Sequence, residues 1–228
     1  MQRHRTSRGM RRGRAHRTAG AAGRSARRRD YHHGDLRVTL LDTVGRIIRE
    51  RGIAFVSIRE VARRASVSHA APAHHFRNKS GLLTAFAAQG YDRLAEAMGD
   101  AVASAHATTP PDVLEAMGRA YVRFALDNRE HFGIMFRAEL LDSHDELYVR
   151  ATGRAFAAVR DTMARAASDG YLNGADPMVT VASAWSLVHG LAALWLSGQM
   201  QDRTGSSDAD AFAAAVTAFF VEKVMRQR

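Results

Sequence analysis

The sequence lacks cysteine altogether and has only four prolines. Without thiols the chain cannot form disulfides, thiolate-ligated zinc sites or iron–sulfur clusters, and it has no cysteine nucleophile. The absence of cysteine suits a reducing cytosol, and we expect a cytoplasmic protein. Few prolines and frequent alanine favour helix over strand. Because no alternating strand pattern occurs along the chain, we predict an all-α fold.

The sequence signatures of enzymes and membrane proteins are missing as well. No Ser/His/Asp motif, glycine-rich phosphate loop or His-Glu-x-x-His motif occurs, so we predict that the protein is not an enzyme. One acidic cluster could suggest a metal site; it consists of Glu139, Asp142, His144, Asp145 and Glu146. Its spacing matches no metal-ligand motif, so we interpret it as a solvated helix start. Neither a metal nor another cofactor is expected. The uncharged stretch 179–197 is about 19 residues long, near the length of a membrane span. Its serines, histidine and glycine indicate instead a buried helix of a protein without a membrane partner.

Positive charge is concentrated at one end of the sequence. Residues 1–29 contain eleven arginines and no acid, whereas the remaining chain has 22 basic and 23 acidic side chains. Met1 and Met10 are the only large apolar residues of this segment, so it cannot bury enough surface to offset the entropy of ordering. We predict a disordered Arg-rich tail over 1–29. It is either a basic arm for DNA phosphates, a segment without a dedicated role, or the product of a start codon placed too far upstream.

Three short helices are predicted after the tail. Apolar residues recur at helical spacing over 35–51 and indicate an amphipathic helix. Ser57 with Glu60 matches a capping box that opens a second helix, and Ser68 is suited to cap a third helix over 69–76. Two short helices joined by a tight turn are the layout of a helix-turn-helix DNA-binding unit.

Further helices are predicted over the rest of the chain. Breaks at prolines, glycines and Asn-Gly divide it into stretches at about 78–108, 112–128, 131–140, 144–169, 177–198 and 208–226. Residues 198–208 are interpreted as a loop.

Net charge differs between the predicted helix-turn-helix region and the rest of the chain: the charges of residues 30–90 sum to +4 and those of residues 91–228 to −5. A basic head and an acidic body are typical of a protein that meets DNA with one end.

Three runs within the stretch from Tyr31 to Phe86 form one combined signature: Ser57-Ile-Arg-Glu-Val-Ala62, Val67-Ser68 and Phe76-Arg-Asn-Lys-Ser-Gly-Leu-Leu83. In this order they resemble the DNA-binding part of the tetracycline-repressor (TetR) family of bacterial transcription regulators. The run Trp185-Ser-Leu-Val-His189-Gly190 resembles a C-terminal subtype of the family named for Trp-His-Gly. The resemblance extends over about residues 30–226 and leaves the tail uncovered.

The resemblance implies a homodimer with an N-terminal three-helix helix-turn-helix DNA-binding domain at 30–80 and a helical ligand-binding and dimerisation domain at 81–228. The implied partners are a palindromic double-stranded DNA operator, a second copy of the chain and a small, largely apolar effector. The implied function is a sequence-specific transcriptional regulator, a repressor released by its ligand. Two alternatives stay open: a non-specific nucleic-acid-binding protein that relies on its basic tail, and a ligand-binding dimer with a degenerate head.

The DNA contacts implied by the resemblance fall on the second and third helices and on the start of the fourth. Recognition-helix residues that would face base edges are His69, Ala70, Ala71 and Pro72, and Arg59 on the preceding helix is the candidate for a guanine. Candidates for phosphates are Ser57, Ser68, His74, His75 and Lys79. A solvated surface charge is the alternative for Arg59, and a scaffold contact for His75. The family usually has an aromatic residue, most often Tyr, where this chain has Ala73, so one phosphate contact is lost.

Large and polarizable side chains of the second half are candidates for an effector pocket. They are Met98, Tyr121, Phe124, Phe132, Met135, Phe136, Phe156, Met163, Trp185, His189 and Trp195. Ordinary core packing is the alternative for each of them. Trp185 and His189 are four residues apart and share a helix face, and Gly190 permits a close helix approach at the dimer seam.

Overall fold

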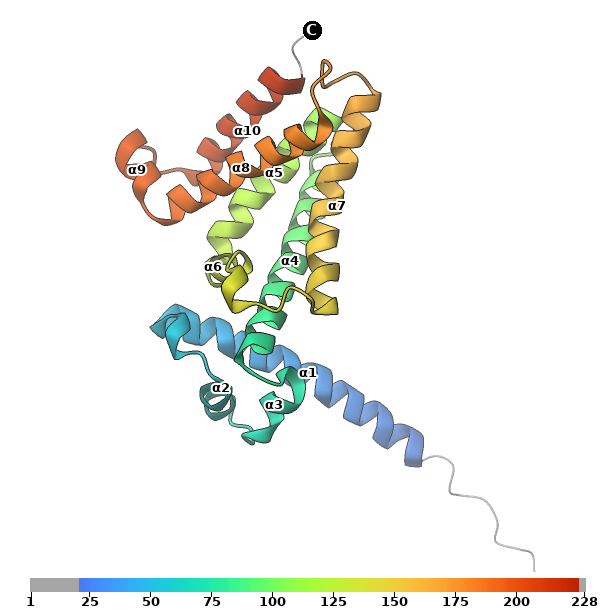
Figure 1. Ribbon diagram of the computed structural model, residues 1–228, viewed down its shortest axis with the longest axis vertical. Coiled ribbons are helices and arrows are strands. Elements are labelled where there is room, and N and C mark those ends of the chain that lie inside the picture. Colours follow the sequence, from blue (N-terminus) through green and yellow to red (C-terminus); the bar gives the residue numbers. More distant parts are fainter. Residues whose placement is uncertain (1–20, 226–228) are drawn as a thin grey trace, which may run out of the picture. The chain divides into compact units, whose positions relative to one another are not determined.

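The computed structural model describes residues 21–225, and these form helices joined by short connections, without a β-strand in this range (Figure 1). The all-α prediction is therefore confirmed. The α-helices are α1 (Ala21–Arg51), α2 (Ile58–Arg64), α3 (Ala70–Phe76), α4 (Lys79–Ser104), α5 (Pro110–Asp127), α6 (Arg129–Met135), α7 (Glu146–Ser168), α8 (Pro177–Leu196), α9 (Gln199–Thr204) and α10 (Ala209–Met225). Short 3-10 turns, η1 (Ile53–Phe55) and η2 (Ala138–Leu140), follow α1 and α6.

Helix α1 begins well before the expected start at residue 35. Residues 21–29, which we expected in a disordered tail, belong to this helix, and residues 1–20 lie outside the described part. No proline interrupts this stretch, and alanine and arginine are both good helix formers. The chain divides into two compact units after Thr39, which lies within α1.

The turn between α2 and α3 follows a Schellman motif. The Val67 amide donates to the Ala62 carbonyl at 3.1 Å, and the Ser66 amide donates to the Arg63 carbonyl at 3.3 Å. Ser66 has a φ of 55° and takes the left-handed position where glycine is usual. Helix α3 then begins at Ala70 with His69 at the N-cap, so the prediction that Ser68 caps it is wrong. The Ala71 amide donates to the Ser68 carbonyl at 3.1 Å, so the backbone carbonyl of Ser68 bonds to the first turn of α3.

Ser57 caps α2 as predicted. Its hydroxyl accepts a hydrogen bond from the Glu60 amide at 3.1 Å. In a full capping box the Glu60 carboxylate would accept from the Ser57 amide. Here it accepts hydrogen bonds from Arg63 and Arg64 instead. Buried residues from four successive helices form the core of the head: Leu40, Val44, Ile47, Val61, Ala62, Phe76 and Leu82.

A tight turn joins α3 to α4. Arg77 has φ 61° and ψ −59°, and the Asn78 amide donates to the Phe76 carbonyl at 2.7 Å, which makes a γ-turn. The Asn78 side chain accepts from the Gly81 amide and caps α4. A Cβ at Gly81 would overlap the Phe76 carbonyl oxygen, so only glycine permits this approach.

The body is a bundle in which α5 packs against α4, α7, α8 and α10, and α4 packs against α7 (Figure 1). Thr109 and Asp176 cap α5 and α8, each directly before a proline at the first helical position. Residues 199–204, expected in a loop, form α9. Helix α8 is long and apolar enough to cross a membrane by those two criteria alone, but it packs within the bundle.

Candidate nucleic-acid interface and ligand pocket

The head exposes most of the residues predicted to touch DNA. Arg59 on α2, His69 before α3 and Lys79 at the start of α4 are exposed, and neither Arg59 nor Lys79 has an ion-pair partner among residues 21–225. Ala70, His74 and Ser68 are exposed as well, Ala71 and His75 are half-buried, and the His75 ring contacts Phe76. The exposed side chains can therefore reach a ligand without breaking an internal contact.

Pro72 is the exception among the predicted DNA contacts. It is buried in the head, so its ring cannot touch a thymine methyl, and this prediction is wrong. Because a helix of seven residues presents only part of its circumference to solvent, Pro72 and Phe76, four positions apart, face the core together.

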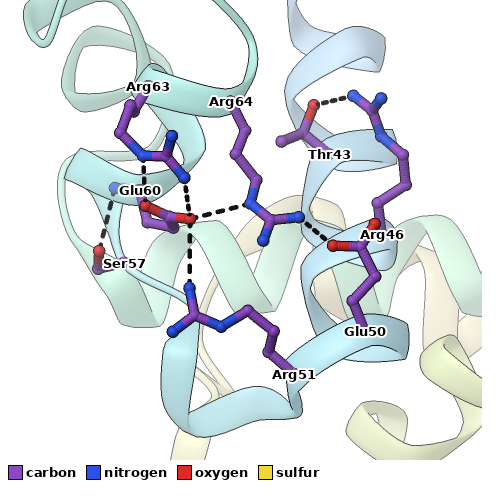
Figure 2. Close-up of polar contacts among 8 residues, drawn as sticks. All are labelled: Thr43, Arg46, Glu50, Arg51, Ser57, Glu60, Arg63 and Arg64. Atoms are coloured by element: carbon purple, nitrogen blue, oxygen red, sulfur yellow. Dashed lines mark hydrogen bonds and ion pairs between the residues drawn. The ribbon is translucent and has the colours of Figure 1, made fainter.

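A cluster of charged side chains fixes α2 on the end of α1 (Figure 2). The Glu60 carboxylate accepts hydrogen bonds from Arg63 at 2.7 Å and Arg64 at 2.9 Å, and Arg51 lies 3.7 Å away. Arg64 also pairs with Glu50 on α1. Hydrogen bonds from Arg63 and Arg64 lower the pKa of Glu60 to about 2.

This cluster separates the arginines of α2 by role. Arg63 and Arg64 are engaged within the head (Figure 2), whereas Arg59 forms no ion pair with an acid in the described part of the chain. Arg59 is therefore the α2 side chain that is available for a base or phosphate. The resemblance already singled out Arg59, and the structure adds that Arg63 and Arg64 are engaged, in the case of Arg64 partly by Glu50 of another helix.

The body contains a cavity of about 420 Å³ between its helices. Five predicted pocket residues line it: Met98, Tyr121, Phe136, Phe156 and Trp185. The remaining wall, which sequence reasoning missed, comprises Tyr91, Leu94, Leu114, Met117, Gly118, Thr152, Gly153, Ala155, Val159, Val181, Ala184, Leu187, Val188, Thr217, Phe220 and Val221. The recurrence of Leu114, Met117 and Tyr121 on one face of α5 was the available signal.

Six predicted pocket residues do not line the cavity, among them Met163 and Trp195, which are buried elsewhere in the body. Phe124 is buried about one turn past the last pocket residue of α5, and Met135 packs on Gly90 of α4. Phe132 packs edge-on against Tyr121 and Phe136, behind the wall. His189 also lies outside the lining, although its ring contacts Phe136 at 4.5 Å between centroids. The size and polarizability of a side chain therefore do not distinguish residues that line the cavity from residues packed behind them.

The polar side-chain groups of the cavity wall are hydroxyls and the indole N–H of Trp185. The Tyr91 hydroxyl donates to the Met135 carbonyl at 3.1 Å, and Tyr121 shares a 2.9 Å hydrogen bond with His189 Nδ1. Burial raises the pKa of both tyrosines, so they stay neutral. Burial also lowers the pKa of His189, which favours the neutral imidazole beside Tyr121.

Helix α6 touches both the head and the layer around the cavity. The Arg49 guanidinium of α1 donates to Glu130 at 2.7 and 3.2 Å. The next residue, His131, stacks on Phe86 of α4 with centroids 3.9 Å apart. At the other end of α6, Phe136 lines the cavity. One short helix therefore connects the cavity wall with the end of α1.

Among the side chains that the structure describes, those of residues 36–225, no three His, Asp or Glu gather in an arrangement that could hold a metal ion.

Comparison with known proteins follows the same division into head and body. Residues 40–86 match the family model described as bacterial regulatory proteins, tetR family, and residues 114–220 match the one described as tetracyclin repressor-like, C-terminal domain. Comparison with curated proteins gives no match.

Solved structures share the fold. A protein of unknown function from Rhodococcus sp. RHA1 is 30% identical, with a TM-score of 0.73, and the match covers 86% of this chain and 98% of that one. A tetR-family regulatory protein from Rhodococcus RHA1 is 19% identical, with a TM-score of 0.66, covering 83% and 96%. FadR from Bacillus subtilis, solved in complex with stearoyl-CoA, is 16% identical, with a TM-score of 0.65, covering 82% and 98%.

The two family models match successive parts of the chain in the order in which head and body follow each other. The chain therefore belongs to the TetR family of bacterial transcriptional regulators.

Proposed function

We propose that the protein is a cytoplasmic repressor that binds a palindromic operator as a homodimer and is released by a small molecule. The observation that carries the proposal is the combination of the exposed, unpaired Arg59 and Lys79 on the helix-turn-helix with a 420 Å³ cavity in the body. Arg59 would read a guanine, and Lys79, at the start of α4, would bind a phosphate.

An apolar face on α8 and α10 supports the homodimer. Large side chains there are 42–64% exposed: Met178, Val179, Trp185, Leu194 and Phe219. Packing of this face against a second copy of the chain would remove its apolar side chains from water, which favours the dimer. The neighbouring Trp185 and His189, with their ring centroids 6.4 Å apart, support the Trp-His-Gly subtype.

Helix α6 supplies a physical route from ligand to DNA. A molecule that displaces Phe136 at the cavity end of α6 would also shift Glu130, which pairs with Arg49 of α1. The ligand can change DNA affinity only by its differential affinity for the two head positions. For a dimer, those positions are set by half-sites about 34–36 Å apart.

Selection of binding sites from a random DNA library at about 150 mM salt tests the proposal. We expect the full chain and a chain beginning at Ala21 to enrich the same palindrome. Arg59→Ala should relax the base preference at one position of the operator, and Lys79→Ala should weaken binding to all DNA sequences alike. Arg63→Ala is the matched control, since Arg63 is engaged by Glu60.

Two outcomes contradict the proposal and separate its alternatives. If only the full chain binds and no motif is enriched, binding resides in the basic tail and is non-specific. If neither chain enriches DNA, the head is degenerate and the protein is a ligand-binding dimer.

A further inference from the structure

The cavity in the body has no charged side chain in its wall. Its 21 lining residues are aliphatic, aromatic, thioether, glycine or hydroxyl residues, drawn from α4, α5, α7, α8, α10 and the end of α6. A carboxylate, phosphate or ammonium group placed there would lose its hydration without gaining a counter-ion. An occupant of this cavity is therefore uncharged over the part that it buries.

Three of the four hydroxyl groups in the wall have already donated their hydrogen. Tyr91 donates to the Met135 carbonyl at 3.1 Å. Thr152 donates to carbonyls of Tyr148 and Val149 at 3.0 Å, and Thr217 to that of Ala213 at 2.8 Å. A hydroxyl group has one hydrogen to give, so these three offer a ligand only an oxygen lone pair.

Tyr121 differs because its partner is a histidine ring nitrogen. When His189 Nδ1 carries no hydrogen, Tyr121 donates to it across the 2.9 Å hydrogen bond. When Nδ1 carries the hydrogen, His189 donates to the Tyr121 oxygen, and the phenol hydrogen becomes available for a ligand. The indole of Trp185 also lines the cavity, and it opposes the rise that burial causes in the pKa of Tyr121. A second polar group of the wall therefore lies beside this hydroxyl.

The volume of the cavity limits the size of the occupant. At the roughly 30 Å³ that a water molecule occupies in the liquid, 420 Å³ corresponds to about 14 non-hydrogen atoms. The walls away from Tyr121 consist of Leu94, Met98, Val181 and their apolar neighbours, so the remainder of the occupant is hydrocarbon.

We propose that the effector is an uncharged, largely hydrocarbon molecule with one carbonyl or hydroxyl oxygen, and that the Tyr121–His189 pair binds this oxygen. A carbonyl selects the tautomer in which His189 donates to Tyr121 and Tyr121 donates to the ligand. A ligand hydroxyl can use either tautomer. This inference rests on the proposed function, because it names the chemical class of ligand for the same regulator.

A series of ten-carbon compounds with different head groups tests the class of ligand. The full-length protein is titrated calorimetrically at pH 7.5 with 2-decanone, 1-decanol, decanoate and decylammonium, each below its micelle concentration. We expect the ketone and the alcohol to bind at least about 100-fold more tightly than the two ions, because an unpaired buried ion costs several kcal/mol. Decanoate or decylammonium binding within tenfold of 2-decanone, or no binding by either neutral compound, overturns the proposal.

Two matched variants test the polar anchor. Tyr121→Phe keeps the ring and removes the hydroxyl. It should weaken the binding of 2-decanone about fivefold, the equivalent of one lost hydrogen bond. Thr152→Val removes a wall hydroxyl that donates within its own helix, and should leave the affinity unchanged. Operator binding by each variant shows that it is folded. Equal affinities of Tyr121→Phe and the parent protein for the ketone overturn the assignment of the anchor.

Operator release is measured separately, so the two proposals can fail independently. Selection of a palindrome in the absence of ligand tests the DNA-binding function alone. If 2-decanone binds and leaves operator affinity unchanged, the assignment of ligand class stands and the proposed release by ligand is refuted.

Discussion

The buried His131 makes stability depend on pH in a calculable way. Its side chain is stacked on Phe86, and its Nε2 lies 3.1 Å from Gln89 Oε1. Burial, reinforced by the charge of Arg93 and opposed by that of Glu130, lowers the pKa of His131 to about 4 from its ordinary 6.5. Acidification must therefore charge this imidazole more readily in the unfolded chain than in the folded protein.

The sign and size of the effect follow from the two pKa values. Between pH 6.5 and pH 4 the unfolded state binds the proton and the folded state does not, so stability falls as the pH falls. The full difference of about 2.5 pKa units corresponds to about 3 kcal/mol at 1.36 kcal/mol per unit. At pH 5 about 2 kcal/mol of this is lost relative to pH 7.5.

Urea unfolding at pH 7.5 and pH 5.0, at one protein concentration, measures this loss. His131→Phe is the matched variant, because it keeps an aromatic ring on Phe86 and removes the titrating group. We expect the parent protein to lose about 2 kcal/mol more than the variant between the two pH values, which separates His131 from the carboxylates that both proteins share. Equal losses, or a His131 resonance that titrates near pH 6.5, would refute the reasoning.

Three further substitutions have expected outcomes. Ser57→Ala removes the acceptor for the Glu60 amide and should cost about 1 kcal/mol in the free energy of unfolding, measured by urea denaturation. Gly81→Ala places a Cβ against the Phe76 carbonyl oxygen and should lower stability by about 2–3 kcal/mol, whereas unchanged stability would contradict the close approach. Ala73→Tyr restores the aromatic residue that is usual in the family, on an exposed position of α3, and should tighten operator binding about fivefold in a fluorescence-anisotropy titration.

Helix boundaries that depend on adjacent residues could be predicted from the sequence. Ser57 and the Asp176-Pro177 pair mark helix starts because a cap bonds to amides two or three positions away. The cap of α3 was predicted wrongly, because Ser68 is a good capping residue by type, yet the helix begins at Ala70 after His69 without a side-chain cap. A serine also gives no sequence sign of the left-handed conformation of Ser66.

The residues that line the cavity could be predicted only in part from the sequence. Helical periodicity identifies the apolar face of α5, but it does not say whether that face meets another side chain or a void. Phe132 and Phe136 are equally large and four residues apart, yet only Phe136 lines the cavity. The engagement of Arg63 by Glu60 could be expected from their spacing, whereas the pairing of Arg64 with Glu50 depends on how two helices cross.

The length of α4 has a mechanical consequence. This helix begins at Lys79, beside the turn that ends α3, and continues without interruption past Met98 in the wall of the cavity. At 1.5 Å per residue, the two positions are about 28 Å apart along one rod. A tilt of about 5° about the cavity end would move the other end by about 2.5 Å, comparable to the length of a hydrogen bond. Small adjustments around a ligand are thereby enlarged, by the geometry of one helix, to the scale on which a phosphate contact is made or lost.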